Sequence, residues 1–137
     1  MIVFDTNVAS ELMKAAPDPA VTSWYATHSS MGLYTTAITV AEIRYGIARL
    51  PSGRRRTVLS EAAAEIFAEF ADSILPFDAA AAEVYPEVVI GRERAGLPID
   101  EADAQIAAIC RLADAALATR NTKDFVGTGL ELVNPWE

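Results

Sequence analysis

The stretch Ile2-Val3-Phe4-Asp5 decides the fold, because it is a short apolar run that ends at an acid. An unbroken apolar run of this length is typical of a strand that is buried on both faces of a sheet. A helical stretch follows directly, from Thr6 to about Lys14. A buried strand that leads straight into a helix is typical of parallel α/β folds. We therefore expect Asp5 to lie at the carboxyl end of the first strand.

The alternation of strands and helices continues along the chain. Short apolar runs predict further strands at 33–36, 74–77, 116–119 and 130–133. Amphipathic stretches predict helices that begin at Pro19, near Thr39, at Arg54, at Asp78 and at Asp100, with a bend or break of the fourth at Pro86. Pro76 places the third strand at an end or edge. The pattern predicts an α/β fold with three layers, α/β/α, around a short parallel sheet of four to five strands.

The length of 137 residues is typical of one domain. No low-complexity linker and no repeat of solenoid length divides the chain, so we expect a single domain over residues 1–137. The N-terminal apolar run is too short for a signal peptide or a membrane anchor. We therefore expect a cytoplasmic protein with no membrane partner.

The balance of charges limits the chemistry. The chain has 11 basic and 19 acidic side chains, and the net charge of −8 disfavours a broad basic surface for duplex nucleic acid. Nucleic acid stays open as a substrate, because a metal ion neutralises phosphate locally. A single cysteine, Cys110, and a single histidine, His28, exclude a disulfide framework, a cysteine zinc site and a multi-histidine metal site.

Four acids recur where a parallel α/β sheet binds its ligands, beyond the carboxyl ends of the strands. They are Asp5, Glu42, Asp103 and Asp124. Each one alone has a structural explanation, since Thr39-x-x-Glu42 matches a capping box and the aspartates suit helix N-termini. If the strands are neighbours, however, the four carboxylates converge.

Convergence of these acids would need a compensating charge. Two carboxylates about 5 Å apart repel each other by roughly 3 kcal/mol at an effective dielectric near 20. A cluster of oxygen ligands suits Mg²⁺ or Mn²⁺, which a few carboxylates hold together with water and substrate phosphate. Such a site polarises a phosphodiester and activates water for in-line attack.

Four short motifs stand in order along the chain. They are Asp5-Thr6-Asn7, Thr39-Val40-Ala41-Glu42-Ile43, Ala102-Asp103-Ala104-Gln105-Ile106-Ala107-Ala108 and Thr119-Arg120-Asn121-x-x-Asp124-Phe125. Together they resemble the motifs of PIN-domain nucleases, and most closely the VapC toxins of bacterial toxin–antitoxin pairs, in the FitB-like branch. The resemblance covers the whole chain, through Val133-Asn134-Pro135-Trp136. Each motif is short, but the order and spacing of all four are specific.

This resemblance implies a PIN-like fold and a Mg²⁺- or Mn²⁺-dependent endoribonuclease with the four acids as its catalytic residues. It also implies a toxin that forms a homodimer and that a small cognate antitoxin neutralises. Asp5 and Asp103 would be the direct metal ligands, while Glu42 and Asp124 would hold the metal through water or position the nucleophile. The resemblance also assigns supporting polar positions beside the site to Thr6 and Asn121.

Other residues carry weaker signals. Asp100 is an extra acid beside Asp103 and the main rival for its role. Arg120 and Lys123 lie nearest the predicted site and are the candidates for RNA contact, whereas Arg54-Arg55-Arg56 is typical of a solvated helix face. Aromatic side chains at helical spacing suit core or dimer packing better than base stacking; they are Trp24, Tyr25, Tyr45 and Tyr85.

Three other functions fit parts of the pattern. A haloacid-dehalogenase-type phosphatase needs a second aspartate two residues after the first, where this chain has Asn7. A receiver-like phosphoacceptor domain would use Asp78, but Asp5 has no adjacent acid and only Lys123 is loosely placed for it. A purely partner-binding α/β domain would leave the four acids as unrelated helix caps.

Overall fold

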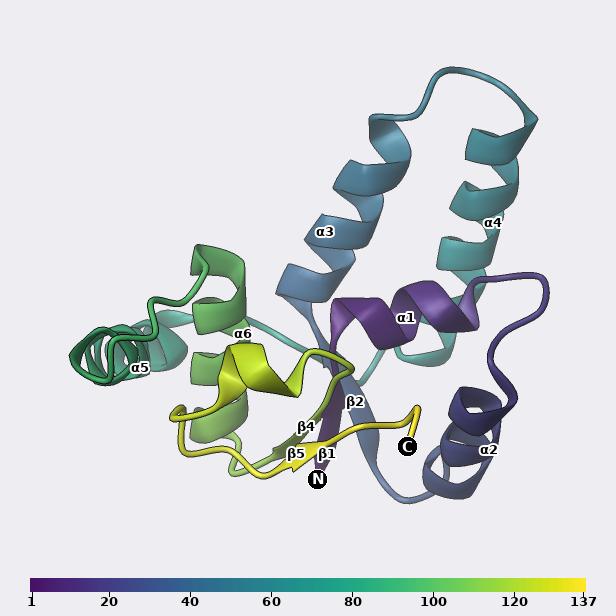
Figure 1. Cartoon of the computed structure of the whole chain (residues 1–137). Helices are drawn as coiled ribbons and strands as arrows, with labels where there is room; N and C mark the ends of the chain where they lie inside the picture. Colours follow the sequence, from purple (N-terminus) through teal and green to yellow (C-terminus); the bar gives the residue numbers. More distant parts are fainter.

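The computed structural model describes all 137 residues, as six α-helices, one 3-10 helix and a five-stranded sheet (Figure 1). The strands are β1 (Ile2–Phe4), β2 (Leu33–Thr36), β3 (Ile74–Leu75), β4 (Ala116–Ala118) and β5 (Leu132–Val133). Every neighbouring pair is parallel, and the order is β3-β2-β1-β4-β5. β1 is therefore the central strand, and β3, which ends just before Pro76, is an edge strand as predicted.

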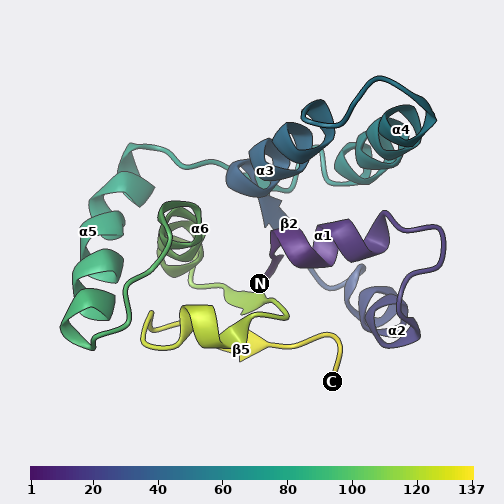
Figure 2. The same cartoon turned by 45° about the horizontal axis from the view of Figure 1, so that its top comes forward.

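The helices form a layer on each side of this sheet (Figures 1 and 2). They are α1 (Thr6–Leu12), α2 (Pro19–His28), α3 (Ala37–Ala48), α4 (Arg54–Glu69), α5 (Ala79–Arg94), α6 (Glu101–Leu112) and the 3-10 helix η1 (Thr122–Phe125). α1 to α4 cover one face, α5 and α6 cover the other, and the α3–α4 hairpin projects away from the sheet. The prediction of a three-layer α/β/α fold around a short parallel sheet is confirmed.

The core is divided in two by the sheet, because successive side chains of a strand point to opposite faces. Phe4 belongs to a buried cluster with residues of α1 to α4, including Val8 and Phe67. Its neighbour Val3 belongs to a second cluster with Ile106 of α6 and Phe125 of η1. Both faces of β1 are thus fixed by packing, and the residue that follows this strand, Asp5, is held in a defined place.

The start of α3 differs from the prediction. Its N-cap is Thr36, whose Oγ1 accepts a hydrogen bond from the Thr39 N–H at 3.1 Å, and its first residue is Ala37. The helix therefore begins two residues before the expected start near Thr39, and the alternative explanation of Glu42 as part of a capping box with Thr39 is wrong. Because Thr36 caps the helix, the Glu42 carboxylate is left free to interact with α1.

Other local predictions agree with the structure. Asp18 caps α2, with Pro19 as its first residue, and Asp78 caps α5. The helix is not broken at Pro86, where a bend or break was predicted: α5 continues through Pro86 to Arg94. No helix combines the length and the apolar character that a membrane span requires.

Candidate active site

An acidic cavity of about 460 Å³ lies at the carboxyl end of β1. Four acids line it: Asp5, Glu11, Glu42 and Asp103. The cations in its wall are Lys14 and Arg120, and the one hydrophobic side chain is Trp136. Three of the four predicted acids thus meet in one cavity, although they come from three different segments of the chain: the N-cap of α1, the body of α3 and the first turn of α6.

Asp5 is buried, with 4% of its surface exposed, and its two carboxylate oxygens have different partners. Oδ1 accepts a hydrogen bond from the Thr6 N–H at 2.7 Å, which caps α1. Oδ2 accepts one from the Thr119 hydroxyl at 2.8 Å. Burial raises the pKa of the Asp5 carboxyl, the two hydrogen bonds lower it, and the charges of Glu42 and Asp124 raise it. Asp5 is therefore both a helix cap and a member of the acidic cavity.

Thr119 and Asn7 form a network around Asp5 to which the sequence analysis assigned no role. The buried Thr119 Oγ1 accepts hydrogen bonds from Asn7 Nδ2 and from the Asn121 N–H, each at 3.1 Å. Asn7 Oδ1 in turn accepts one from the Arg120 N–H at 3.2 Å. These bonds tie the loop after β4 to the first turn of α1. The sequence signal for Thr119 was its place as the first residue of the motif Thr119-Arg120-Asn121-x-x-Asp124-Phe125, at the end of the predicted strand 116–119.

Glu42 is held toward the cavity by Thr6. The Thr6 hydroxyl donates a hydrogen bond to Glu42 Oε1 at 2.6 Å, and it also lies 3.2 Å from the Thr39 hydroxyl. Thr6, the predicted supporting residue, therefore joins the first turn of α1 to α3. The bond fixes the Glu42 carboxylate about two turns into α3 rather than at its cap.

Asp103 lies in the first turn of α6 and is half-buried at the cavity wall. The pKa of the Asp103 carboxyl is raised to about 7, first by burial and then by the charges of Asp5, Asp100, Glu42 and Asp124, in that order. The rival acid Asp100 is the exposed N-cap residue of α6 and does not line the cavity. Geometry therefore favours Asp103 over Asp100 as the acid that faces a ligand.

The last predicted acid, Asp124, stands apart from the other three. It lies on η1 and does not line the cavity, although its charge contributes to the raised pKa of both Asp5 and Asp103. Asn121 and Arg120 do line the cavity, as predicted for residues beside the site, whereas Lys123 does not. The structure thus brings together most of the predicted residues and leaves Asp124 and Lys123 at the periphery.

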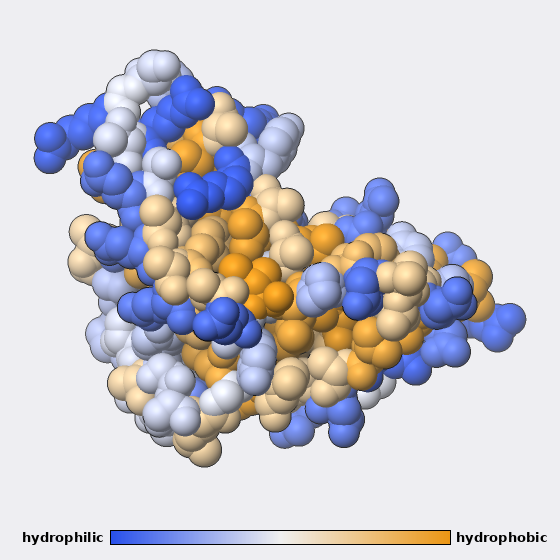
Figure 3. Space-filling model, turned by 180° about the vertical axis from the view of Figure 1, so that it is seen from behind, coloured by the Kyte–Doolittle hydropathy of each residue, from blue (hydrophilic) through white to orange (hydrophobic).

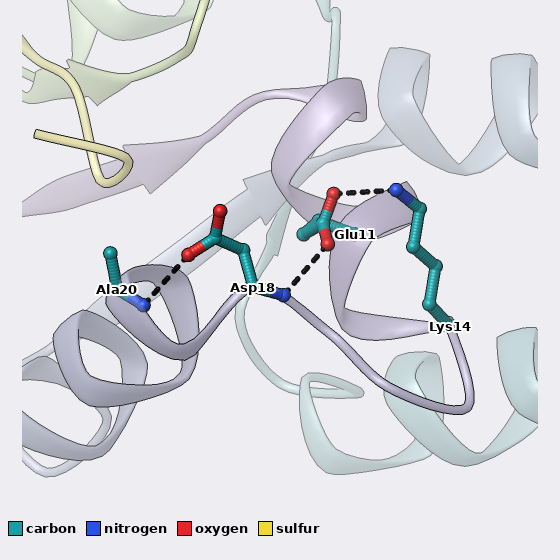
Figure 4. Close-up of polar contacts among 4 residues, drawn as sticks. All are labelled: Glu11, Lys14, Asp18 and Ala20. Carbon is teal, nitrogen blue, oxygen red and sulfur yellow. Dashed lines mark hydrogen bonds and ion pairs between the residues drawn. The ribbon is translucent and has the colours of Figure 1, made fainter.

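Glu11 is an additional acid that the sequence analysis did not assign to the site. It is buried, and its carboxylate accepts hydrogen bonds at 2.9 Å from Lys14 Nζ and from the Asp18 N–H (Figure 4). Lys14 and the Asp18 N–H hold the pKa of the Glu11 carboxyl below its usual value. Glu11 is therefore already neutralised, unlike Asp5 and Asp103. The spacing of Glu11 and Lys14, three residues apart on α1, was the available signal.

The oxygen donors of the cavity suit a hard divalent cation that takes few protein ligands. Neither Asp5 nor Asp103 belongs to an ion pair, and burial raises the pKa of both carboxyls. No three histidine, cysteine, aspartate or glutamate side chains are arranged as ligands of one ion. Mg²⁺ usually keeps several waters and takes one or two carboxylates, so the residues present fit such an ion.

Known proteins resemble this chain along its full length. The model of the PIN domain family matches residues 2–128, a range that includes all four predicted acids. VapC ribonuclease Y4jK from Sinorhizobium fredii is 43% identical, over 100% of this chain and 99% of the relative. Toxin FitB from Neisseria gonorrhoeae is 37% identical, over 99% of both chains. The solved structure of FitAcB from Neisseria gonorrhoeae has a TM-score of 0.91 at 37% identity and covers 100% of this chain and 99% of that chain.

Proposed function

Since the chain belongs to the PIN domain family, we propose that it is a metal-dependent endoribonuclease that hydrolyses RNA phosphodiester bonds at the acidic cavity. The observation that carries this proposal is the meeting of Asp5, Glu42 and Asp103 in one cavity without neutralising partners. The similarity to VapC ribonuclease Y4jK supports the choice of RNA as the substrate. Residues 1–137 would act as one nuclease domain, since both core clusters share a single sheet.

In this proposal Asp5 and Asp103 would hold Mg²⁺ or Mn²⁺, and the bound ion would supply positive charge to the phosphate and lower the pKa of the attacking water. The chain's own residues provide the geometry. Thr119 and the Thr6 N–H fix the two oxygens of Asp5, and the Thr6 hydroxyl fixes Glu42. Glu42 and the more distant Asp124 would hold the metal through water or position the nucleophile.

The direct test is cleavage of a single-stranded RNA by the purified protein with Mn²⁺ and with EDTA. Asp5→Asn and Asp103→Asn should each abolish cleavage, because each removes a charged ligand. Asp100→Asn is the matched control, since Asn is an equally good N-cap and this acid does not line the cavity. His28→Ala and Cys110→Ala should also leave cleavage nearly intact. Cleavage that persists in Asp5→Asn, or that withstands EDTA, would overturn the assignment.

We also propose that the protein is the cytoplasmic toxin of a toxin–antitoxin pair. Its similarity to Toxin FitB supports this role, and the resemblance to VapC toxins implies a small cognate antitoxin as the partner. The receiver-like alternative gains no support, because the Asp78 carboxylate caps α5 by accepting a hydrogen bond from the Ala81 N–H and does not line the acidic cavity.

A homodimer is the remaining part of the proposal. The face opposite the view of Figure 1 carries a broad hydrophobic band between the α3–α4 hairpin and α5 (Figure 3). Large hydrophobic side chains are exposed on these helices, among them Tyr45, Val58 and Ile90. Apolar surface of this extent marks an interaction site. Light scattering should give the mass of two chains, and the mass of one chain would exclude the homodimer.

A further inference from the structure

The two cations that line the acidic cavity differ in their interaction partners. Lys14 Nζ lies 2.9 Å from the Glu11 carboxylate and is committed to that ion pair. Arg120 belongs to neither of the two ion pairs in the structure, Lys14–Glu11 and Arg111–Glu87. Its guanidinium carbon instead lies 5.1 Å from the centre of the Trp136 ring. Arg120 is thus the one cation of the cavity that has no carboxylate partner.

Trp136 is itself held in a fixed position. It is partly buried against the core cluster around Phe4, and its backbone N–H donates a hydrogen bond to Asn134 Oδ1 at 3.0 Å. The backbone of Arg120 is fixed from the other side, because its N–H donates to Asn7 Oδ1 at 3.2 Å. The stacked pair is therefore anchored at both ends to elements that also position Asp5.

We propose that Trp136 positions the Arg120 guanidinium as the anchor for a phosphate that flanks the scissile phosphate of single-stranded RNA. This inference rests on the proposed function. Stacking uses the face of a guanidinium and leaves the N–H groups at its edge to donate hydrogen bonds to phosphate oxygens. The ring also restricts a flexible side chain before the substrate arrives, which lowers the entropic cost of binding.

The charge of the cavity explains why such an anchor matters. An RNA strand that approaches Asp5, Glu42 and Asp103 meets carboxylates on a protein with a net charge of −8. Because no acid neutralises Arg120, its charge attracts the RNA strand at this place. This attraction offsets the long-range repulsion where the RNA backbone has to lie. Trp136 acts through Arg120 in this scheme, so it is a positioning residue and not a catalytic one.

The experiment measures KM and kcat for a labelled single-stranded RNA at saturating Mn²⁺. Arg120→Ala and Trp136→Ala should each raise KM roughly tenfold with little change in kcat, since a charge-assisted contact is lost. The slope of log KM against log salt should fall in magnitude by about one for both variants. Trp136→Phe keeps a ring for stacking and should restore KM. Arg49→Ala removes an arginine that stacks on Tyr45 away from the cavity and should change neither constant.

The double variant Arg120→Ala/Trp136→Ala separates this inference from a general structural role. If Trp136 acts through Arg120, KM of the double variant equals that of Arg120→Ala alone. The inference would be overturned if the effects of the two single variants on KM multiplied in the double variant, or if KM were unchanged in Arg120→Ala. Neither result would affect the proposal that the wild type cleaves RNA. A shift in the Mn²⁺ midpoint at constant KM would also overturn it, because Arg120 would then only balance the carboxylates.

If Trp136→Ala does not fold, Trp136→Leu takes its place in the cycle. A wild type that does not cleave RNA would instead remove the proposed function itself.

Discussion

At the scale of single residues, Asp103 carries the clearest electrostatic signature of the site. Its carboxyl has a pKa of about 7, against 3.8 for an ordinary aspartate, because of burial and the neighbouring acids. Between pH 3.8 and about pH 7, the Asp103 carboxyl is therefore protonated in the folded protein and ionised in the unfolded chain. The stability that this proton contributes is fully present below about pH 4 and is lost as the pH rises through about 7.

The first prediction compares wild type and Asp103→Asn in EDTA. Below about pH 4 the two should melt at similar temperatures, because the wild-type carboxyl is protonated in both the folded and the unfolded chain. At pH 8 the variant should be more stable by about 1–2 kcal/mol, a value discounted for the partial exposure of the carboxyl. Loss of a favourable contact with the helix dipole, about 0.3–1 kcal/mol, opposes this gain without cancelling it. A variant that is less stable at pH 8 would mean that Asp103 only stabilises the start of α6.

Thr119 gives the second prediction at this scale. Thr119→Val keeps the shape of a buried side chain but removes the hydroxyl that donates to Asp5 and accepts from Asn7 and Asn121. The pKa of the Asp5 carboxyl should rise further, because one of its hydrogen bonds is lost. We expect a loss of about 1–3 kcal/mol in stability and weaker Mn²⁺ binding, measured by thermal melts and metal titration.

Thr128 provides the control for this substitution. It is also buried, and its hydroxyl donates only to the Phe125 carbonyl, away from the cavity. Thr128→Val should therefore lower the melting temperature without changing Mn²⁺ binding. Equal effects of the two variants on Mn²⁺ binding would contradict a specific role for Thr119.

At the scale of elements, Arg92 joins α5 to the segments that carry two of the predicted acids. This arginine is buried, and its guanidinium donates to the Val126 carbonyl at 2.6 Å and to the Lys123 carbonyl at 3.4 Å, next to Asp124. It also donates to the Pro98 carbonyl at 3.5 Å, just before α6. No acid pairs with it, so its charge is satisfied only by backbone carbonyls of the two loops.

Arg92→Met should loosen these loops selectively. The substitution keeps much of the buried side-chain volume but leaves the carbonyls without a donor, which costs about 1–3 kcal/mol. Amide hydrogens of residues 122–128 should exchange faster, while those of α3 stay protected. Hydrogen exchange with mass spectrometry measures this difference. Uniform acceleration across the chain would mean that Arg92 supports global stability rather than these loops.

The local sequence pattern predicted the helices and strands well, but it predicted the contacts between them poorly. The strands and their order along the chain follow from short unbroken apolar runs such as Ile2–Phe4. The start of α3 was misplaced because Thr36 and Thr39 are both good caps, and only the extended backbone of Thr36 decides between them. The contacts of Arg92 and Trp136 gave no usable signal, because their partners are distant in the sequence. Arg120 lies more than 15 residues from Trp136, and Val126 lies more than 30 residues from Arg92.

At the scale of the whole molecule, the acidic quartet was only partly predictable. Asp5, Glu42 and Asp103 line one cavity at the carboxyl end of β1. Position after a strand was enough to find Asp5 and Glu42, whereas Asp103 was found from its place in the first turn of the helix that Asp100 opens. Asp124 lies on η1 at the end of a loop, where sequence position sets no direction for its side chain. The strand order itself depends on packing between distant segments and was not available from the motifs.

The whole-molecule prediction concerns growth. Expression of this chain alone in a bacterial host should arrest growth, because an uninhibited endoribonuclease removes RNA that the cell needs. Asp103→Asn should relieve the arrest, whereas Asp100→Asn should not. Soluble protein levels of all three have to be matched by immunoblot. Normal growth of cells that contain soluble, Mn²⁺-binding wild type would contradict the toxin role but leave the nuclease chemistry intact.

The position of Trp136 has a practical consequence for anyone who purifies the protein. Glu137 follows the cavity wall directly, so an affinity tag fused after it would emerge beside the Trp136–Arg120 pair. Met1 lies at the opposite end of β1 from Asp5, so a tag there would leave from the amino end of this central strand. An N-terminal tag is therefore the better choice for kinetics, since a C-terminal tag would compete with RNA for the same entrance.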